Sequence, residues 1–225
     1  MIGIRGKLSI FSNEKNPHLV SYLKEDALND DIEDITAVYL VLDSNHDDEI
    51  VLYFGLKCGM ISLPFPSEVL KLFDDEKEEL LKNMPEDKLE VLDYIRLFIQ
   101  DAEQKHDINK VARTIQGIEL SHFCINQQYR ENRDKENDNT KGIGEYLFYE
   151  VIMPIVYGVK DHVGCKFLYL FAADSSDDLR LIRNYREHLG FMSVEEFDAN
   201  DFGVSDVIPI MPFYDYTCEF MIMPL

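Results

Sequence analysis

The sequence predicts an α/β protein, because strand-like and helix-like segments alternate along the chain. Residues 118–126 have the composition of a strand, and residues 166–172 form a nearly continuous apolar run, which is typical of a strand buried on both faces of a sheet. Between these strands, apolar residues recur at helical spacing from Leu147 to Ile155. Gly142 and Gly144 open that helix. The order strand, loop, glycine turn and helix is therefore the central feature of the sequence.

The N-terminal part predicts a short strand followed by a helix. Residues 7–11 have the pattern of a first strand. Pro17 is typical of the first turn of a helix, and the following apolar residues, including Leu23, Ala27 and Leu28, would lie on one face of it.

A hairpin and a pair of helices follow. Residues 35–42 and 49–57 are rich in β-forming side chains and are separated by polar turn residues, so they predict two hairpin strands. Residues 67–82 and 86–103 predict two helices separated by a proline. This pair forms a helical insertion at 64–112 in what we otherwise expect to be one domain, residues 1–225.

The rest of the chain supplies a polar loop, one more helix and the closing strands. Residues 127–140 are polar apart from Tyr129, which predicts an exposed loop. Residues 177–189 predict a helix, and residues 208–210 and 218–223 predict closing strands.

Composition describes a globular protein with a strong acidic excess. Of 225 residues, 46% are hydrophobic and 29% charged, and 43 acidic against 22 basic residues give a formal net charge of −21. Such a charge repels polyanions, so we expect no nucleic-acid partner, no membrane partner and a cationic or amine substrate. The alternative is that the acidity only secures solubility.

The cysteines and the hydropathy indicate a cytoplasmic protein without a metal site. The four cysteines, Cys58, Cys124, Cys165 and Cys218, are widely spaced and form no Cys-x-x-Cys pair. Three of them lie in apolar runs, as reduced buried thiols do. No apolar stretch approaches the length of a membrane-spanning helix.

The glycine turn has the chemistry of a site for one pyrophosphate. The first turn of a helix has unpaired N–H groups and the positive end of the helix dipole, and glycine lets a phosphate approach the backbone closely. The turn is not a P-loop, because no Gly-Lys-Ser/Thr follows. It is not a dinucleotide fingerprint either, because Leu147 stands where the third glycine is required.

Residues 115–191 resemble the GCN5-related N-acetyltransferase (GNAT) superfamily. The family motif Gln/Arg-x-x-Gly-x-Gly/Ala matches Asn139 to Gly144, with asparagine in the first position, and Tyr185 precedes a Leu-Gly-Phe sequence as in the family. The resemblance implies a mixed, mostly antiparallel central sheet flanked by helices, with the helical insertion between the third and fourth strands. It also implies transfer of an acetyl group from acetyl-CoA to a primary amine, directly within a ternary complex.

The resemblance also implies a general base and a general acid. Glu119 matches the family glutamate that takes the proton of the amine; alternatively it only pairs with a cation. His122 is a competing base or a structural histidine. Tyr185 matches the tyrosine that protonates the coenzyme A thiolate, although it lies five residues before Gly190 where the family has four, and the other interpretation is a plain core or surface tyrosine.

Cofactor contacts are implied for three segments. The backbone of a strand segment would bind the pantetheine arm as an added strand would, the glycine turn would bind the pyrophosphate, and one asparagine would touch the arm. These residues are Phe123, Cys124, Ile125, Asn139, Lys141, Gly142, Ile143, Gly144, Glu145 and Asn184. Arg130 is an alternative source of the cation that Asn139 lacks.

The implied partners are an amine acceptor, either a small molecule or a protein amine, and acetyl-CoA as the donor without any metal. A homodimer is compatible with the sequence. The alternative function is a non-catalytic acyl-CoA-binding or protein-interaction module on the same fold.

Overall fold

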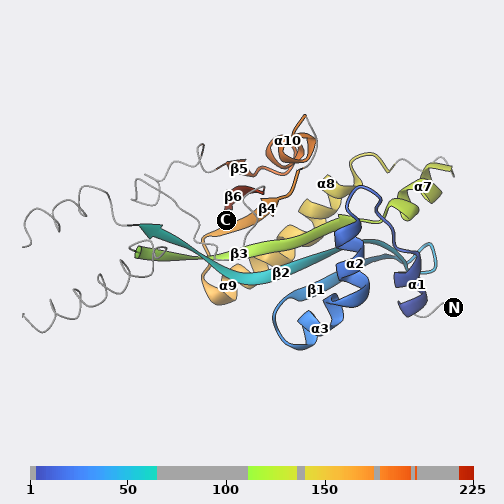
Figure 1. Ribbon diagram of the computed structural model, residues 1–225, viewed down its shortest axis with the longest axis horizontal. Coiled ribbons are helices and arrows are strands. Elements are labelled where there is room, and N and C mark those ends of the chain that lie inside the picture. The colour runs from blue at the N-terminus through green and yellow to red at the C-terminus, as the bar shows by residue number, and fades with distance from the viewer. Residues whose placement is uncertain (1–3, 65–110, 136–139, 175–177, 194–195, 197–217) are drawn as a thin grey trace, which may run out of the picture. The chain divides into compact units, whose positions relative to one another are not determined.

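The computed structural model describes residues 4–64, 111–135, 140–174, 178–193, 196 and 218–225 (Figure 1). The chain forms two compact units, one of residues 1–59, 116–193 and 216–225 and a second of residues 60–115 and 194–215. The helices expected at 67–82 and 86–103 and the strand expected at 208–210 lie outside the described residues. The single domain with an insertion at 64–112 therefore stays a prediction.

A six-stranded mixed sheet, in the order β1-β2-β3-β4-β6-β5, forms the centre of the first unit. β3 and β4 are parallel, whereas the β1–β2, β4–β6 and β5–β6 pairs are antiparallel. The strands are β1 (Ala37–Asp43), β2 (Glu49–Pro64), β3 (Val111–Ile125), β4 (Phe167–Ala172), β5 (Met192–Ser193) and β6 (Glu219–Pro224). The expected mixed, mostly antiparallel sheet and the predicted hairpin are confirmed.

The described helices lie in three groups along the chain (Figure 1). The first group is α1 (Ile4–Ile10), α2 (Pro17–Glu25) and α3 (Ala27–Ile32). The second is α7 (Gln127–Lys135), then α8 (Ile143–Leu147), the π-helical turn η2 (Phe148–Ile152) and α9 (Met153–Val163), the last three without interruption. The third is α10 (Arg180–Glu187). No described helix is both long enough and apolar enough to cross a bilayer.

Two apolar clusters pack on the two faces of the sheet. Phe148 and Ile152 of η2 are fully buried against one face, in a cluster that includes Leu52, Ile118 and Leu168. A smaller cluster joins α2 and α3 to the other face, and its buried members are Phe11, Leu23, Ala27, Ile50, Tyr53 and Cys124. Each fully buried large side chain contributes about 1.5–3 kcal/mol.

The predicted strand at 7–11 is wrong, because residues 4–10 form α1. The sequence pattern misleads because the buried side chain of this helix is Lys7, while Ile4 and Ile10 are each 47% exposed. The Lys7 ammonium donates hydrogen bonds to the carbonyls of Asp47 and Asp48 in the β1–β2 turn.

Two further predictions need correction. The helix starting at Pro17 exists, but it divides at Asp26 into α2 and α3, and Leu28 is 65% exposed rather than packed. The exposed loop predicted at 127–140 is wrong for its first part, because residues 127–135 form α7, in which Tyr129 and Arg133 are buried.

Candidate functional site

The two central parallel strands pair over only part of their length. Their register runs from Gly117–Phe167 to Glu119–Tyr169. β3 nevertheless continues to Ile125, and β4 is paired with β6 along its whole length on its other edge. β3 and β4 therefore part just after Glu119 and Tyr169, at the centre of the sheet.

A change of side-chain alternation in β3 accompanies this parting. Leu120, Phe123 and Ile125 all pack with the cluster under η2 and α9, whereas His122 stacks on Tyr22 of the opposite face. Successive side chains of a regular strand alternate between faces, so residues 120 and 123 cannot share a face without one extra residue between them. This pattern indicates a β-bulge between Leu120 and Phe123, which turns the end of β3 relative to its start.

The glycine turn lies at the start of α8, as the sequence predicts. Gly142 has a left-handed conformation (φ 78°), and its carbonyl accepts the first helical hydrogen bond from the Tyr146 N–H at 3.0 Å. The N–H groups of Gly144 and Glu145 belong to the first turn, where the helix itself offers no acceptor. Because α8, η2 and α9 are continuous, the positive end of a long helix lies at these groups.

The two glycines of the turn have different surroundings. A Cβ on Gly142 would meet no atom of the described residues within 4 Å. A Cβ on Gly144 would lie 2.7 Å from Cδ1 of Ile125. Gly144 thus brings the helix start against the end of β3, in the part of the strand beyond its last pair with β4.

A threonine connects the turn to the preceding helix. Thr140 is 5% exposed, and its hydroxyl donates to Oδ1 of Asp134 at 2.7 Å. Its carbonyl accepts the N–H of Ile143 at 3.1 Å. Asn139, the expected first residue of the phosphate motif, lies outside the described residues. Arg130 is exposed on α7.

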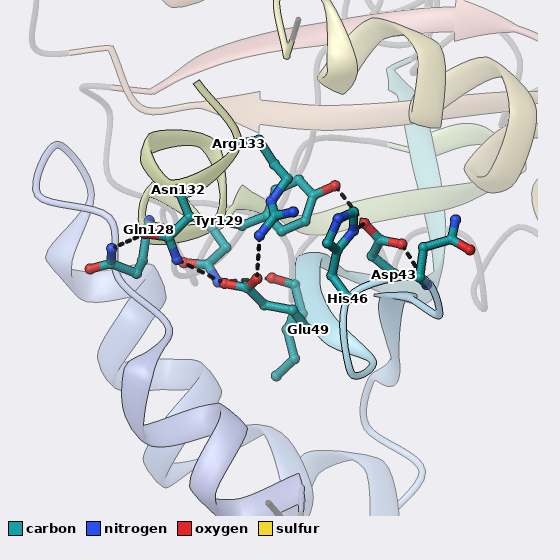
Figure 2. Close-up of polar contacts among 10 residues, drawn as sticks. Asp43, His46, Glu49, Gln128, Tyr129, Asn132 and Arg133 are labelled. Atoms are coloured by element: carbon teal, nitrogen blue, oxygen red, sulfur yellow. Dashed lines mark hydrogen bonds and ion pairs between the residues drawn. The ribbon is translucent and has the colours of Figure 1, made fainter. Parts of the chain in front are cut away.

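A polar network holds α7 against the β1–β2 hairpin (Figure 2). The Tyr129 hydroxyl donates to Oδ2 of Asp43 at 2.9 Å, and Nδ1 of His46 lies 2.6 Å from the same oxygen. Arg133 lies 3.9 Å from Oε2 of Glu49, with its guanidinium 5.7 Å from the centre of the Tyr129 ring. These contacts fix the helix that precedes the glycine turn.

The network shifts the pKa of both partners of its central hydrogen bond. Burial alone would raise the pKa of Asp43, but hydrogen bonds from His46, Tyr129 and the Asn45 backbone outweigh it and lower that pKa. Burial, with the hydrogen bond to Asp43, raises the pKa of Tyr129 to about 12. The pair is therefore a carboxylate and a neutral phenol across the neutral pH range.

Glu119, the expected general base, lies at the last paired position before the strands part. Burial raises the pKa of its carboxyl above the usual value, although Lys57 and a hydrogen bond from Tyr169 act in the opposite direction. The Tyr169 hydroxyl donates to Oε2 of Glu119 at 3.3 Å. A carboxylate with a raised pKa is a stronger proton acceptor than an ordinary one.

His122, the competing base, is held as a neutral ring. Its imidazole stacks on Tyr22 with a centroid distance of 3.7 Å, and Nδ1 lies 3.0 Å from the Ser121 hydroxyl. Burial first, and Lys57 second, lower the pKa of His122 to about 4. A ring with such a pKa is a poor proton acceptor at neutral pH, so the environment favours Glu119.

Tyr185, the expected general acid, is buried on α10. It is 8% exposed, and its ring packs edge-on against Phe191 at 5.9 Å. Burial, followed by the nearby Cys124 and Asp174, raises its pKa far above the usual 10, so the phenol keeps its proton. Tyr185 belongs to the apolar cluster that also contains Phe148.

The remaining expected residues differ in what they offer. The side chain of Cys124 is buried on the face of the sheet that α2 covers, so Cys124 can offer a ligand only its backbone groups. The Glu145 carboxylate lies 3.4 Å from Nδ1 of His188, and this contact involves the side chain of Glu145 but not its backbone N–H. Lys141 and Asn184 are exposed. Tyr169 could not be singled out from the sequence, because its pairing with Glu119 follows only from the strand register.

Comparison with known proteins shows the fold. No protein-family model and no curated protein sequence matches the chain. A tyrosine-to-phenylalanine mutant of KacT matches at 14% identity and a TM-score of 0.51, over 96% of this chain and 86% of that chain. An AtaT mutant toxin of the same kind matches at 13% identity and a TM-score of 0.52, over 96% of this chain and 82% of that chain. The same mutant bound to the C-terminus of the antitoxin AtaR and acetyl-CoA matches at 12% identity and a TM-score of 0.51, over 96% of this chain and 84% of that chain.

These solved structures have the GNAT fold, and the chain described here has the same fold. The expected fold is confirmed at an identity too low to transfer an activity.

The expectation that nucleic acid is excluded is wrong for proteins of this fold. AtaT complexed with acetyl-methionyl-tRNAfMet and a KacTA–DNA complex are both among the matching structures, each at 13% identity and a TM-score of 0.48. The charge argument fails because net charge describes only the average potential, whereas binding depends on the local potential of one surface.

The Asp43 network yields a prediction about stability and pH. Asp43→Asn removes the carboxylate that accepts the Tyr129 hydrogen bond, and we expect a loss of about 1–3 kcal/mol of unfolding free energy at pH 7. Because the folded-state pKa is lowered, this stabilisation is present above the unfolded pKa of about 3.9 and is lost as the pH falls through the folded value. Denaturant unfolding at pH 7 and pH 3 measures it. A difference between wild type and variant that does not shrink toward pH 3 contradicts the assignment.

Proposed function

We propose that this protein is an acetyl-CoA-dependent N-acetyltransferase that transfers the acetyl group directly to an amine. The observation that carries the proposal is the parting of β3 and β4 after Glu119, beside a helix start opened by Gly142. The first feature offers a strand edge to an extended thioester arm, and the second offers N–H groups to a pyrophosphate. The AtaT structure with acetyl-CoA, which has the same fold, supports this choice of donor.

The residues present fit the donor. The segment from Phe123 to Ile125 lies beyond the last β3–β4 pair and would bind the pantetheine arm through its backbone. The N–H groups of Gly144 and Glu145 would bind the pyrophosphate, for which the described part of the chain leaves room over Gly142. Charge-assisted contacts of this kind contribute about 1.5–3 kcal/mol each.

The proposed chemistry assigns one proton transfer to each of two residues. Glu119 accepts the proton that the amine nitrogen loses as its C–N bond to the acetyl carbon forms. The C–S bond then breaks, and the departing thiolate takes a proton, for which the resemblance implies the Tyr185 phenol, although burial raises the pKa of this phenol and makes it a weaker acid. Burial raises the pKa of the Cys124 thiol to about 12, which argues against an acetylated intermediate on this cysteine.

A second candidate is a module that binds acyl-CoA without catalysis. The observation that favours it is the burial of Tyr185, because a phenol packed among Phe148 and Phe191 needs an opening to reach a thiolate. Calorimetric binding of acetyl-CoA without turnover on any acceptor would favour this candidate, whereas robust turnover on one acceptor would exclude it.

The proposed acceptor is an amine, and a panel of amines can identify the molecule that bears it. A suitable panel contains polyamines, amino acids, aminoglycosides, peptides and aminoacyl-tRNA, the last because of the AtaT complex with an acetylated aminoacyl-tRNA. Thiol release from acetyl-CoA measures turnover with each acceptor. A homodimer remains part of the proposal, and light scattering measures it.

The glycine turn allows a test of donor binding with a matched control. Gly142 and Gly164 are both left-handed and lie at opposite ends of the same continuous helix, and a new Cβ on either would meet no described residue within 4 Å. Gly142→Ala and Gly164→Ala should each lose about 1 kcal/mol of stability, from the same backbone strain. Only Gly142→Ala should also weaken acetyl-CoA binding in calorimetry, by about tenfold, because its methyl group enters the phosphate space. Equal affinities in the two variants would show that the turn is only structural.

The two catalytic assignments have a separate kinetic test. Glu119→Gln and Tyr185→Phe should each lower kcat by about 10²- to 10⁴-fold while the Kd for acetyl-CoA stays within about threefold, because each removes one proton transfer and no donor contact. Steady-state thiol release and calorimetry give the two quantities. Turnover that survives both substitutions would remove the catalytic assignment.

A further inference from the structure

We infer that Tyr169 is a positioning residue that fixes the carboxylate of Glu119 for proton transfer, and that Gly59 provides the space this requires. The inference rests on the proposed function, in which Glu119 takes the amine proton. It adds two residues, from strands on either side of β3, to the machinery around that base.

The first observation is the geometry of the Tyr169–Glu119 pair. The two residues are directly opposite each other in the last pair of the β3–β4 register. The Tyr169 hydroxyl donates to Oε2 of Glu119 at 3.3 Å. One carboxylate oxygen is thereby engaged, and Oε1 is the oxygen left to accept a proton from an amine.

The second observation is that Tyr169 itself is fixed by aromatic packing. It is 3% exposed, and its ring centroid lies 6.1 Å from Phe167, 5.9 Å from Phe171 and 5.6 Å from Phe220. The ring therefore has little rotational freedom, because buried rings sit in close-packed surroundings. A hydroxyl on such a ring holds its acceptor in one place.

The third observation explains the glycine on β2. A Cβ at Gly59 would lie 1.9 Å from the Tyr169 hydroxyl oxygen and 2.7 Å from Cζ of the ring. Real Cβ atoms do not approach so closely, and a buried ring has no free rotamer to escape into. The Tyr169 hydroxyl thus reaches from β4 across β3 to the backbone of β2, and only glycine at position 59 permits this.

Two neighbours in the described part of the chain set the charge around Glu119. Lys57 on β2 and the Tyr169 hydroxyl on β4 both stabilise the carboxylate, whereas burial opposes it and is the larger effect. Loss of the Tyr169 hydroxyl removes one of the two stabilising groups, so the pKa of Glu119 should rise further.

The test is the pH dependence of Tyr169→Phe, which removes one oxygen and keeps the ring. Glu119 must be ionised to accept a proton, so kcat/KM falls on the acidic side of its pKa. We expect this acidic limb to move to higher pH by about one to two units in Tyr169→Phe. Tyr53→Phe is the matched control, because its buried hydroxyl donates to the backbone carbonyl of Leu19 at 2.6 Å and touches no carboxylate. The acidic limb of the kcat/KM profile of Tyr53→Phe should not move.

A direct titration separates this inference from the proposed function. The carboxyl carbon of Glu119, labelled with ¹³C and followed by NMR, reports its pKa in the full chain without any acceptor. A pKa that is the same in wild type and Tyr169→Phe overturns the inference even if turnover is robust. Wild-type protein without turnover on any acceptor refutes the proposed function, while a raised pKa in the variant would still establish the Tyr169 contact.

Gly59→Ala gives a second, independent outcome. Its methyl group should displace the Tyr169 hydroxyl and raise the pKa of Glu119 as Tyr169→Phe does. In the Gly59→Ala/Tyr169→Phe double variant, the loss of melting temperature should be smaller than the sum of the single losses, because the first clashing atom is gone. Additive losses would show that Gly59 and Tyr169 do not interact.

Discussion

The incomplete pairing of β3 and β4 is the constraint on which the rest of the site depends. Backbone N–H and C=O groups inside a sheet are normally paired, because an unpaired buried group costs as much as a lost hydrogen bond. Here the pairing ends at Glu119 and Tyr169 although both strands continue. The open edge persists because β6 pairs with β4 along its full length and because Phe148 and Ile152 pack beneath the strands.

The start of α8 is fixed beside this edge by one contact with β3 and one with α7. Gly144 allows α8 to pack against Ile125, the last residue of β3. On the other side, Thr140 binds Asp134 of α7, and α7 is held to the β1–β2 hairpin through Tyr129. A strand edge and a set of helical N–H groups thus lie together, with glycine required at the point of contact. The arrangement suits a ligand with an extended arm and a pyrophosphate.

Elements with an apolar buried face could be predicted from the sequence, and elements with a polar buried face could not. The run at 166–172 and the Gly-x-Gly start were recognisable, because hydrophobicity and glycine chemistry mark them directly. In α7 the buried residues include Arg133, which faces Glu49, so hydrophobic periodicity is missing. In α1 the buried residue is Lys7. Within the site, Glu119 was found through a family resemblance, whereas Tyr169 required the strand register.

The most direct measurement of the central claim is amide hydrogen exchange with and without acetyl-CoA. The account predicts that acetyl-CoA slows exchange at the N–H groups in two short segments, residues 123–125 at the end of β3 and residues 144–145 at the helix start. N–H groups of β1 and β2, such as that of Leu52, should keep their rates apart from any general stabilisation. Protection confined to other segments, with 123–125 and 144–145 exchanging as in the free protein, would contradict the claim that the parted strands and the glycine turn form the donor site.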